Sequence, residues 1–460
     1  MEQKLGRDLT VGSIPKHLLV FSIPTLIGNL LQTGYSIINT IWIGNIVGED
    51  GIGATTVTTS VIFVIIALAI GLTTATTILV SQYYGAKNYE KVKLTVNNSF
   101  IVALIIGAVM TIGGILFRET ILRFMNTPEE IFQSASGYLK ITLTGLILYF
   151  LSALIIAILR GVGDSFTPLI FTAIGVTINA VLDPMLILGI GPFPELGLNG
   201  AAYASIIAQG IAFMFSLYYL NHKENFISLD YKRLLFDKEV TLKICKLGLP
   251  FAVQSAFVSI GGLFINTFVN AFGASAINAY GAASRIDQIA FMPGQSIGAA
   301  VATLTGQNLG ANKPERIKLI FKWSIIFTTV FTLAVSACAV SLPGHILSIF
   351  GFDSGSQGFD IGIEYLRIVG SSYVFLCVMF AIGGIFNGSG LTTVSMALAL
   401  LSLWVVRLPL AAVLSKTSLG LKGIWLSIGI SFFVVMSVAL IYYYSGRWKK
   451  AAYKVIKSVS

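Results

Sequence analysis

The chain has 460 residues, of which 55% are hydrophobic and only 11% are charged. Soluble domains carry about 25% charged residues, so this composition excludes an ordinary soluble protein and indicates an integral membrane protein. The net charge of +10 is better explained by basic loops that fix membrane topology than by nucleic acid, which we do not expect as a partner.

The apolar segments predict twelve membrane-spanning helices. The amino-terminal segment is polar, so no signal peptide is expected. Apolar runs then follow one another, centred near residues 30, 65, 105, 150, 178 and 210, and near residues 258, 290, 332, 375, 402 and 434. Since a helical span needs about 20 apolar residues, these runs fit an all-α membrane protein.

Lysine and arginine concentrate at both ends of the chain and in alternate loops between the spans. By the positive-inside rule, this pattern places both termini in the cytoplasm and makes the chain a multi-pass protein of the cell membrane. Both termini on one side require an even number of spans, which twelve satisfies.

The second half of the sequence repeats the first at an interval of about 226 residues. The matched segments share order and spacing: "SQYYGAKNYEKVK" (81–93) with "GQNLGANKPERIK" (306–318), "GYLKI" (137–141) with "EYLRI" (364–368), and "LGLNGAA" (196–202) with "LGLKGIW" (419–425). Six spans per copy is an even number, so both copies enter the membrane in the same orientation and form parallel repeats.

The repeat divides the chain into two six-helix lobes. We expect an N-terminal lobe at 1–221, a cytoplasmic linker at 222–246, and at 247–460 a C-terminal lobe with a basic cytoplasmic tail. Within the linker, the basic amphipathic stretch 231–246 is expected to lie on the membrane surface.

A carboxylate lies inside the apolar run "TINAVLDPMLILG" (177–189). Asp183 and Asn179 are four residues apart, so they share one helical face. An ionised carboxylate in hydrocarbon costs several kcal/mol, which a bound proton or cation relieves. Asp183 is therefore a candidate proton or sodium site, and the alternative is a carboxylate that only bonds neighbouring helices. Pro184 would leave a backbone carbonyl unpaired for a ligand.

Tyr35 and Asn39, in "YSIINTIWIGN" (35–45), form a similar polar face on the first span. A polar face inside a bilayer is costly unless it meets a partner or a water-filled cavity. The alternative to a functional role is a simple interhelical hydrogen bond.

Asp287, in "SRIDQIAFMPG" (284–294), is the other acidic residue within a span. Two interpretations stay open for it: an interhelical ion pair, for which Arg285 and Arg407 are candidates, or attraction of a cationic substrate. Phe291 and Met292 are candidates for an apolar substrate cleft, because such side chains re-pack around different ligands.

The three cysteines and three histidines are scattered along the chain, without metal-ligand spacing. We found no nucleophile–base set and no nucleotide-binding motif, so we expect neither a cofactor nor an enzymatic activity. A firm metal site is not predicted, although sodium at Asp183 remains open.

Several ordered segments resemble the multidrug and toxic compound extrusion (MATE) transporters over essentially the whole chain. They include "ILRGVGDSFTP" (158–168), "INAVLDPMLILG" (178–189) and "GQNLGA" (306–311), and the stretch from 283 to 311 is similar to the bacterial DinF and MepA-like branches. The resemblance implies two helical lobes with a V-shaped central cleft, antiport of organic cations, and cation binding in the N-terminal lobe.

The family's cation-binding cluster combines a tyrosine and an aspartate in span one, an asparagine and an aspartate in span five, and a hydroxyl in span six. The resemblance places the tyrosine at Tyr35, the span-five pair at Asn179 and Asp183, and the hydroxyl at Ser205. The span-one aspartate falls on Asn39, which is a departure because asparagine cannot titrate. One carboxylate remains to carry one proton per cycle.

These features predict a monomeric efflux antiporter in the lipid bilayer. It would export small amphipathic, mostly cationic drugs in exchange for protons, or alternatively sodium, by rocker-switch alternating access. The runner-up is a flippase for lipid-linked oligosaccharides or peptidoglycan precursors, which usually needs a strongly basic cavity; only Arg285, Arg367 and Arg407 are candidates for one.

Overall fold

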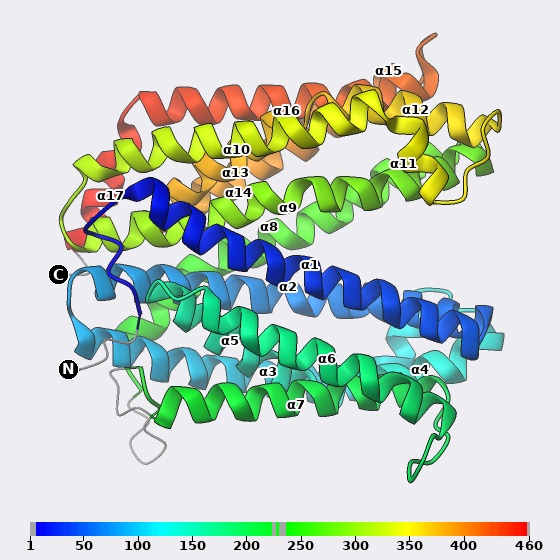
Figure 1. Ribbon diagram of the computed structural model, residues 1–460, viewed down its shortest axis with the longest axis horizontal. Helices are drawn as coiled ribbons and strands as arrows, with labels where there is room; N and C mark the ends of the chain where they lie inside the picture. Colours follow the sequence, from blue (N-terminus) through cyan, green and yellow to red (C-terminus); the bar gives the residue numbers. More distant parts are fainter. Residues whose placement is uncertain (1–5, 223–226, 230–235, 458–460) are drawn as a thin grey trace. The chain divides into compact units, whose positions relative to one another are not determined.

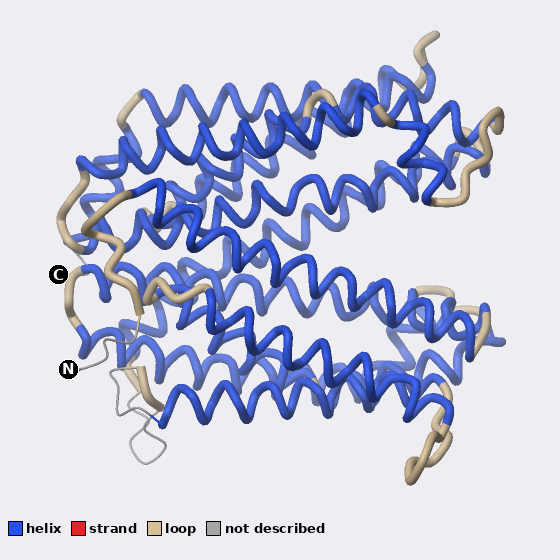
Figure 2. Tube along the Cα trace, in the orientation of Figure 1, coloured by secondary structure: helices blue, strands red, loops and turns tan. Residues whose placement is uncertain are grey.

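Helices make up nearly all of the chain. The computed structural model describes residues 6–222, 227–229 and 236–457, and this part holds helices, turns and loops but no strand (Figures 1 and 2). In chain order the helices are α1 (Ile14–Ile46), α2 (Glu49–Gly85), α3 (Tyr89–Phe124), α4 (Glu129–Thr144), α5 (Leu146–Gly161), α6 (Phe166–Leu188), α7 (Leu198–His222), α8 (Lys238–Asn270), α9 (Ala274–Gly310), α10 (Glu315–Ser341), α11 (Pro343–Ile349), α12 (Gln357–Gly370), α13 (Tyr373–Gly388), α14 (Thr392–Leu400), the π-helix η1 (Leu401–Arg407), α15 (Leu408–Leu414), α16 (Gly420–Tyr444) and α17 (Arg447–Lys457). The predicted all-α fold is confirmed.

Local chemistry fixes several helix ends. The Asn88 side chain accepts a hydrogen bond from the backbone N–H of Lys91 at the start of α3, and Ser356 accepts one from Phe359 at the start of α12. Such caps satisfy backbone donors that the first helical turn leaves unpaired. At the end of α6, Gly189 adopts a left-handed conformation with φ of 69°, which glycine tolerates without steric cost.

Nine helices in the described residues are long and apolar enough to cross a membrane, or eleven if each of two bent helix pairs is one span. The pairs are α4 with α5, bent by 46°, and α12 with α13, bent by 43°. α9 is not among the eleven, but its 37 residues give a rise of about 55 Å, longer than the hydrocarbon core. Counted by length, α9 completes the predicted twelve.

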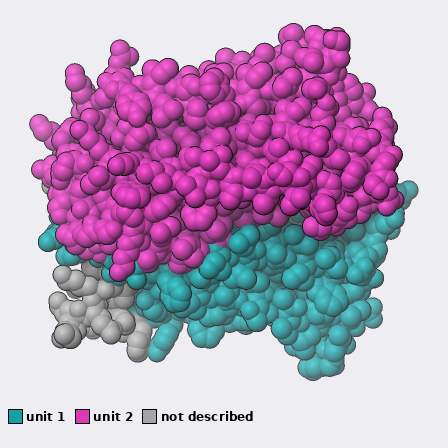
Figure 3. Space-filling view, turned by 45° about the horizontal axis from the view of Figure 1, so that its top comes forward, with its two compact units in different colours: residues 1–7, 27–252 teal, residues 8–26, 253–460 magenta. Residues whose placement is uncertain are grey.

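The chain forms two compact units, coloured separately in Figure 3. Unit 1 comprises residues 1–7 and 27–252, and unit 2 comprises residues 8–26 and 253–460. The first part of α1 therefore packs in unit 2, and the first part of α8 packs in unit 1. Both helices contain a proline shortly before they pass from one unit to the other: Pro24 in α1 and Pro250 in α8.

The lobe boundaries predicted from the repeat follow chain order, and they stay a prediction. Part of the expected linker, residues 223–226 and 230–235, lies outside the described residues. The stretch 231–246 is predicted to lie on the membrane surface. Its second part, from Lys238 onward, instead belongs to α8, which is a candidate span.

Small residues bring α9 and α13 close together in unit 2. A Cβ atom on Gly384 of α13 would collide with the backbone oxygen of Gly298 in α9 and would lie 2.9 Å from Val301 Cβ. Close backbone approach at small residues is a common way for helices to pack within membranes. Val301 belongs to a cluster of buried side chains that also includes Leu18 and Phe21 from the first part of α1.

Candidate functional site

Asp183 is fully buried in unit 1, and only one of its two carboxylate oxygens has a hydrogen-bond donor within the described residues. Its relative exposure is 0%, and that of Asn179, one helical turn earlier on α6, is 6%. Asn179 Nδ2 donates a hydrogen bond to Asp183 Oδ1 over 2.7 Å. Asp183 Oδ2 accepts no hydrogen bond in the described part of the chain. The carboxylate therefore keeps one position where a proton or a cation can bind.

The helix that carries Asp183 continues past the proline that follows it. α6 runs through Pro184 to Leu188. Because proline has no N–H, the carbonyl of Ala180 lacks its usual intrahelical donor, as the sequence predicts. The Ala180 carbonyl oxygen is thus a second oxygen without its regular donor, and it belongs to the same helical turn as Asp183.

Two hydroxyl groups from other helices join this site. Tyr35 on α1 and Ser205 on α7 share a hydrogen bond over 3.3 Å. Tyr35 is also close enough to Asp183 to interact with it electrostatically. Four residues singled out in the sequence, from three helices, are therefore brought together in unit 1: Tyr35, Asn179, Asp183 and Ser205.

Asn39 lies one helical turn after Tyr35, and its amide oxygen is buried without a hydrogen-bond donor among the described residues. No hydrogen bond links it to Asp183 in this part of the chain. The place of Asn39 in the predicted cation-binding cluster therefore stays a prediction. An unsatisfied buried oxygen is nevertheless rare enough to require an explanation.

Tyr138 on α4 is a member of the site that sequence reasoning missed. It is half-buried and interacts electrostatically with Asp183. The internal repeat contained the signal: "GYLKI" aligns Tyr138 with Tyr365 of "EYLRI", and Tyr365 also faces a carboxylate, Asp287. Each unit thus presents a repeat-related tyrosine to a carboxylate within its helices.

Asp287 differs from Asp183, because both of its oxygens accept hydrogen bonds. The hydroxyls of Tyr365 and Tyr373 donate to it, each over 2.5 Å. The ion pair considered with Arg407 does not form: Arg407 Nε donates to Ser431 Oγ over 3.0 Å. Its guanidinium also lies 4.7 Å from the centre of the Phe432 ring, within the range of a cation–π contact.

The other predicted cleft residues lie near Asp287 along α9. Arg285 is exposed and forms no ion pair in the described part of the chain. Phe291 packs edge-on against Tyr373 at 5.3 Å between ring centroids, and Met292 is 7% exposed. Both apolar side chains are packed within unit 2, and their part in substrate binding stays a prediction.

No group of three or more histidine, cysteine, aspartate or glutamate residues that could hold a metal ion occurs in the described part of the chain. A sodium ion at Asp183 would thus depend on hydroxyl, amide and backbone oxygens for the rest of its ligands. The candidates are the oxygens of Tyr35, Ser205 and Ala180.

Comparison with known proteins identifies the family. The family model described as MatE matches the chain twice, at residues 24–185 and 250–413. The chain belongs to the MatE family. The two matches to the MatE model begin 226 residues apart, in agreement with the repeat seen in the sequence.

Relatives within this family cover nearly the full chain. The probable multidrug resistance protein YpnP of Bacillus subtilis is 34% identical over 96% of this chain and 97% of its own length. The multidrug export protein MepA of Staphylococcus saprophyticus is 27% identical over 94% of each. A solved MOP superfamily transporter from Pyrococcus furiosus aligns with a TM-score of 0.90 over 100% of this chain and 99% of that one, at 24% identity, and so shows the same fold.

Proposed function

We propose that this MatE protein exports amphipathic, mostly cationic organic compounds across the cell membrane in exchange for protons, and that Asp183 is the carboxylate that binds the proton. The proposal rests on one observation: Asp183 is fully buried, and its Oδ2 accepts no hydrogen bond among the described residues. The names of two relatives, multidrug resistance for YpnP and multidrug export for MepA, support the class of substrate.

The surroundings of Asp183 favour exchange of a proton over a permanent charge. No basic side chain forms an ion pair with it in the described part of the chain. A buried carboxylate without a counter-charge is costly as an anion, so a proton that arrives from outside relieves a strained state. Release of that proton to the cytoplasm restores the anion.

Protonation would also supply a donor that the site lacks. Asp183 Oδ2 and Asn39 Oδ1 are both buried acceptors, and neither has a hydrogen-bond donor in residues 6–222, 227–229 and 236–457. A proton on Oδ2 turns Asp183 into a donor, for which Asn39 on α1 offers an acceptor. A hydrogen bond between α6 and α1 that exists only in the protonated state would couple proton binding to a rearrangement of unit 1 and so to alternating access.

The test is ethidium extrusion by the purified full chain in proteoliposomes, under a proton gradient or a sodium gradient imposed separately. Asp183→Asn keeps the shape of the side chain but removes the titrating group, so we expect proton-driven export to fall at least tenfold. The matched control is Asp287→Asn, which changes the other carboxylate and should leave coupling in place.

If a sodium gradient alone drove export by the wild type, the coupling ion at this site would be sodium and not the proton. Coupling that survives in Asp183→Asn but fails in Asp287→Asn would move the site to unit 2. Equal proton-driven export by all three proteins would contradict the assignment of Asp183.

The flippase alternative requires clustered basic residues for a pyrophosphate group. Of its three candidates, Arg285 and Arg367 are exposed, and Arg407 is engaged by Ser431 and Phe432. No observation on these residues favours this alternative over export of cations.

A further inference from the structure

The last helix of the described chain is a short basic helix anchored by its apolar side. α17 follows the candidate span α16 after a two-residue turn in which Gly446 has φ of 68°. Trp448 and Ala452 are each 2% exposed, and the Trp448 ring stacks on Tyr443 of α16 with 5.4 Å between centroids. Trp448 Nε1 also donates to the Tyr443 backbone oxygen over 2.9 Å. The side of α17 that bears these residues is therefore fixed on unit 2.

The charged side chains on the opposite side of α17 are all basic. Its sequence, RWKKAAYKVIK, contains no acidic residue, and the exposed basic residues include Arg447, Lys449, Lys450 and Lys454. Because α17 begins where a candidate span ends, we expect this basic side at the level of the membrane–water interface. Basic clusters next to the cytoplasmic end of a span attract anionic lipid headgroups.

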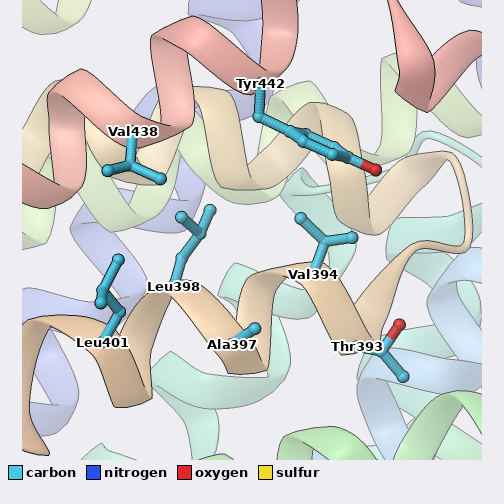
Figure 4. A pocket seen from close by; sticks show the side chains of 7 residues that line it. All are labelled: Thr393, Val394, Ala397, Leu398, Leu401, Val438 and Tyr442. Atoms are coloured by element: carbon cyan, nitrogen blue, oxygen red, sulfur yellow. The ribbon is translucent and has the colours of Figure 1, made fainter. Parts of the chain in front are cut away.

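An apolar groove lies on unit 2 beside the end of α16. It has a volume of about 330 Å³, is open on one side, and is lined by residues of α14, η1 and α16: Thr393, Val394, Ala397, Leu398, Leu401, Val438 and Tyr442 (Figure 4). The stretch 393–401 gives the groove a length of about 12 Å along the helix. A hydrocarbon chain fits such a surface, because almost all the lining atoms are apolar.

The groove and the basic helix both involve residues at the end of α16. Tyr442 lines the groove, and the next residue, Tyr443, is the one on which Trp448 of α17 stacks. We propose that this pair of features is a binding site for an anionic phospholipid, with an acyl chain in the groove and the phosphate headgroup at the lysines of α17. A zwitterionic lipid would place a choline or ethanolamine cation next to the same lysines and bind more weakly.

The test is native mass spectrometry of the detergent-purified full chain with equal amounts of phosphatidylglycerol and phosphatidylcholine that carry identical acyl chains. We expect the wild type to retain phosphatidylglycerol several-fold more strongly. Lys450→Gln/Lys454→Gln removes two charges from one helical face and should lower that retention about 25-fold, since each lysine near an anionic surface strengthens binding roughly fivefold. Ala397→Phe, at an exposed position, should fill the groove and lower retention as well.

Matched controls separate the site from general effects of charge and bulk. Lys140→Gln/Lys416→Gln removes two charges elsewhere, and Ala334→Phe adds a ring at an exposed position of α10; both should bind lipid as the wild type does. Equal retention of the two lipids by the wild type would overturn the proposal, as would equal loss in the variants and their controls. If only the lysine variant lost binding, the groove would have no part and the site as proposed would be wrong. Lipid retention is measured without transport, so its failure would not bear on the role of Asp183.

Discussion

Asp183 on α6 and Asp287 on α9 differ in the hydrogen bonds that their carboxylates accept. Two tyrosine hydroxyls donate to Asp287, whereas Asp183 accepts one amide hydrogen, and its other oxygen is buried with no donor among the residues that the structure describes. Two short donors stabilise a carboxylate as a fixed anion. This difference is why we assign proton exchange to Asp183 and a structural role to Asp287.

The fixed state of Asp287 leads to a stability prediction. Tyr365→Phe removes one donor to the carboxylate and should lower the free energy of unfolding by about 2 kcal/mol, since hydrogen bonds to charged groups contribute about that much. The measurement is the apparent Tm in detergent. Tyr280→Phe is the control, because the Tyr280 ring stacks on Trp425 but its hydroxyl donates no hydrogen bond in the described part of the chain. Equal Tm losses in the two variants would contradict the structural role of this hydrogen bond.

Sequence reasoning found part of the site and missed the rest for a physical reason. The four-residue spacing of Asn179 and Asp183 predicts their shared face, and the structure joins them by a hydrogen bond. The tyrosines that face each carboxylate come from other helices, and helical periodicity does not say which neighbour a face will meet. The internal repeat could have supplied Tyr138, because it aligns this residue with Tyr365.

At the scale of the helices, one irregular element bears on the contacts that Arg407 makes. The residues Leu401–Arg407 form a π-helix, η1, between α14 and α15. A π-helical turn holds more residues than an α-helical turn, so the side chains after it are rotated relative to a regular helix. Regular periodicity could not anticipate this shift, which accompanies the contacts of Arg407 with Ser431 and Phe432 in place of an ion pair with Asp287.

The close approach of α9 and α13 predicts opposite effects for two adjacent glycines. Gly384→Ala would drive a methyl group into the backbone of Gly298 and should lower the free energy of unfolding by about 1–3 kcal/mol. Gly383→Ala has open space around its new methyl group and should be neutral or stabilising by about 0.5–1 kcal/mol, since alanine favours helix. Thermal unfolding of the two variants in detergent measures the difference. A Gly384→Ala variant as stable as Gly383→Ala would mean that these helices are not packed so closely.

At the scale of the whole molecule, the even number of spans leads to a prediction of topology. With the three native cysteines replaced by serine, Glu195→Cys tests the loop after α6 and Ser445→Cys tests the turn before α17; both positions are exposed. A membrane-impermeant maleimide should label position 195 in intact cells and position 445 only after the cells are permeabilised, because both termini are expected in the cytoplasm. Labelling of position 445 in intact cells would reverse the orientation.

The sequence predicts the global plan better than its details. Apolar runs indicate the all-α architecture, and the repeat of about 226 residues reappears as two matches of one family model. The units of packing do not follow chain order, because the first parts of α1 and α8 pack with the other half of the sequence. A repeat in sequence shows which segments are equivalent, but it does not show which copy each segment packs against.

The first part of α1 packs in unit 2, whereas the rest of the helix packs in unit 1, and this division has a consequence for biogenesis. Leu18 and Phe21 leave the ribosome well before most of the side chains they cluster with, because the other buried members of that cluster, outside residues 9–21, begin at Ile297. Synthesis of the intervening ~280 residues takes on the order of tens of seconds, during which lipid must cover these side chains. The first part of α1 therefore reaches its final packing only after the helices of unit 2 have been made, and loss of those helices would disturb α1.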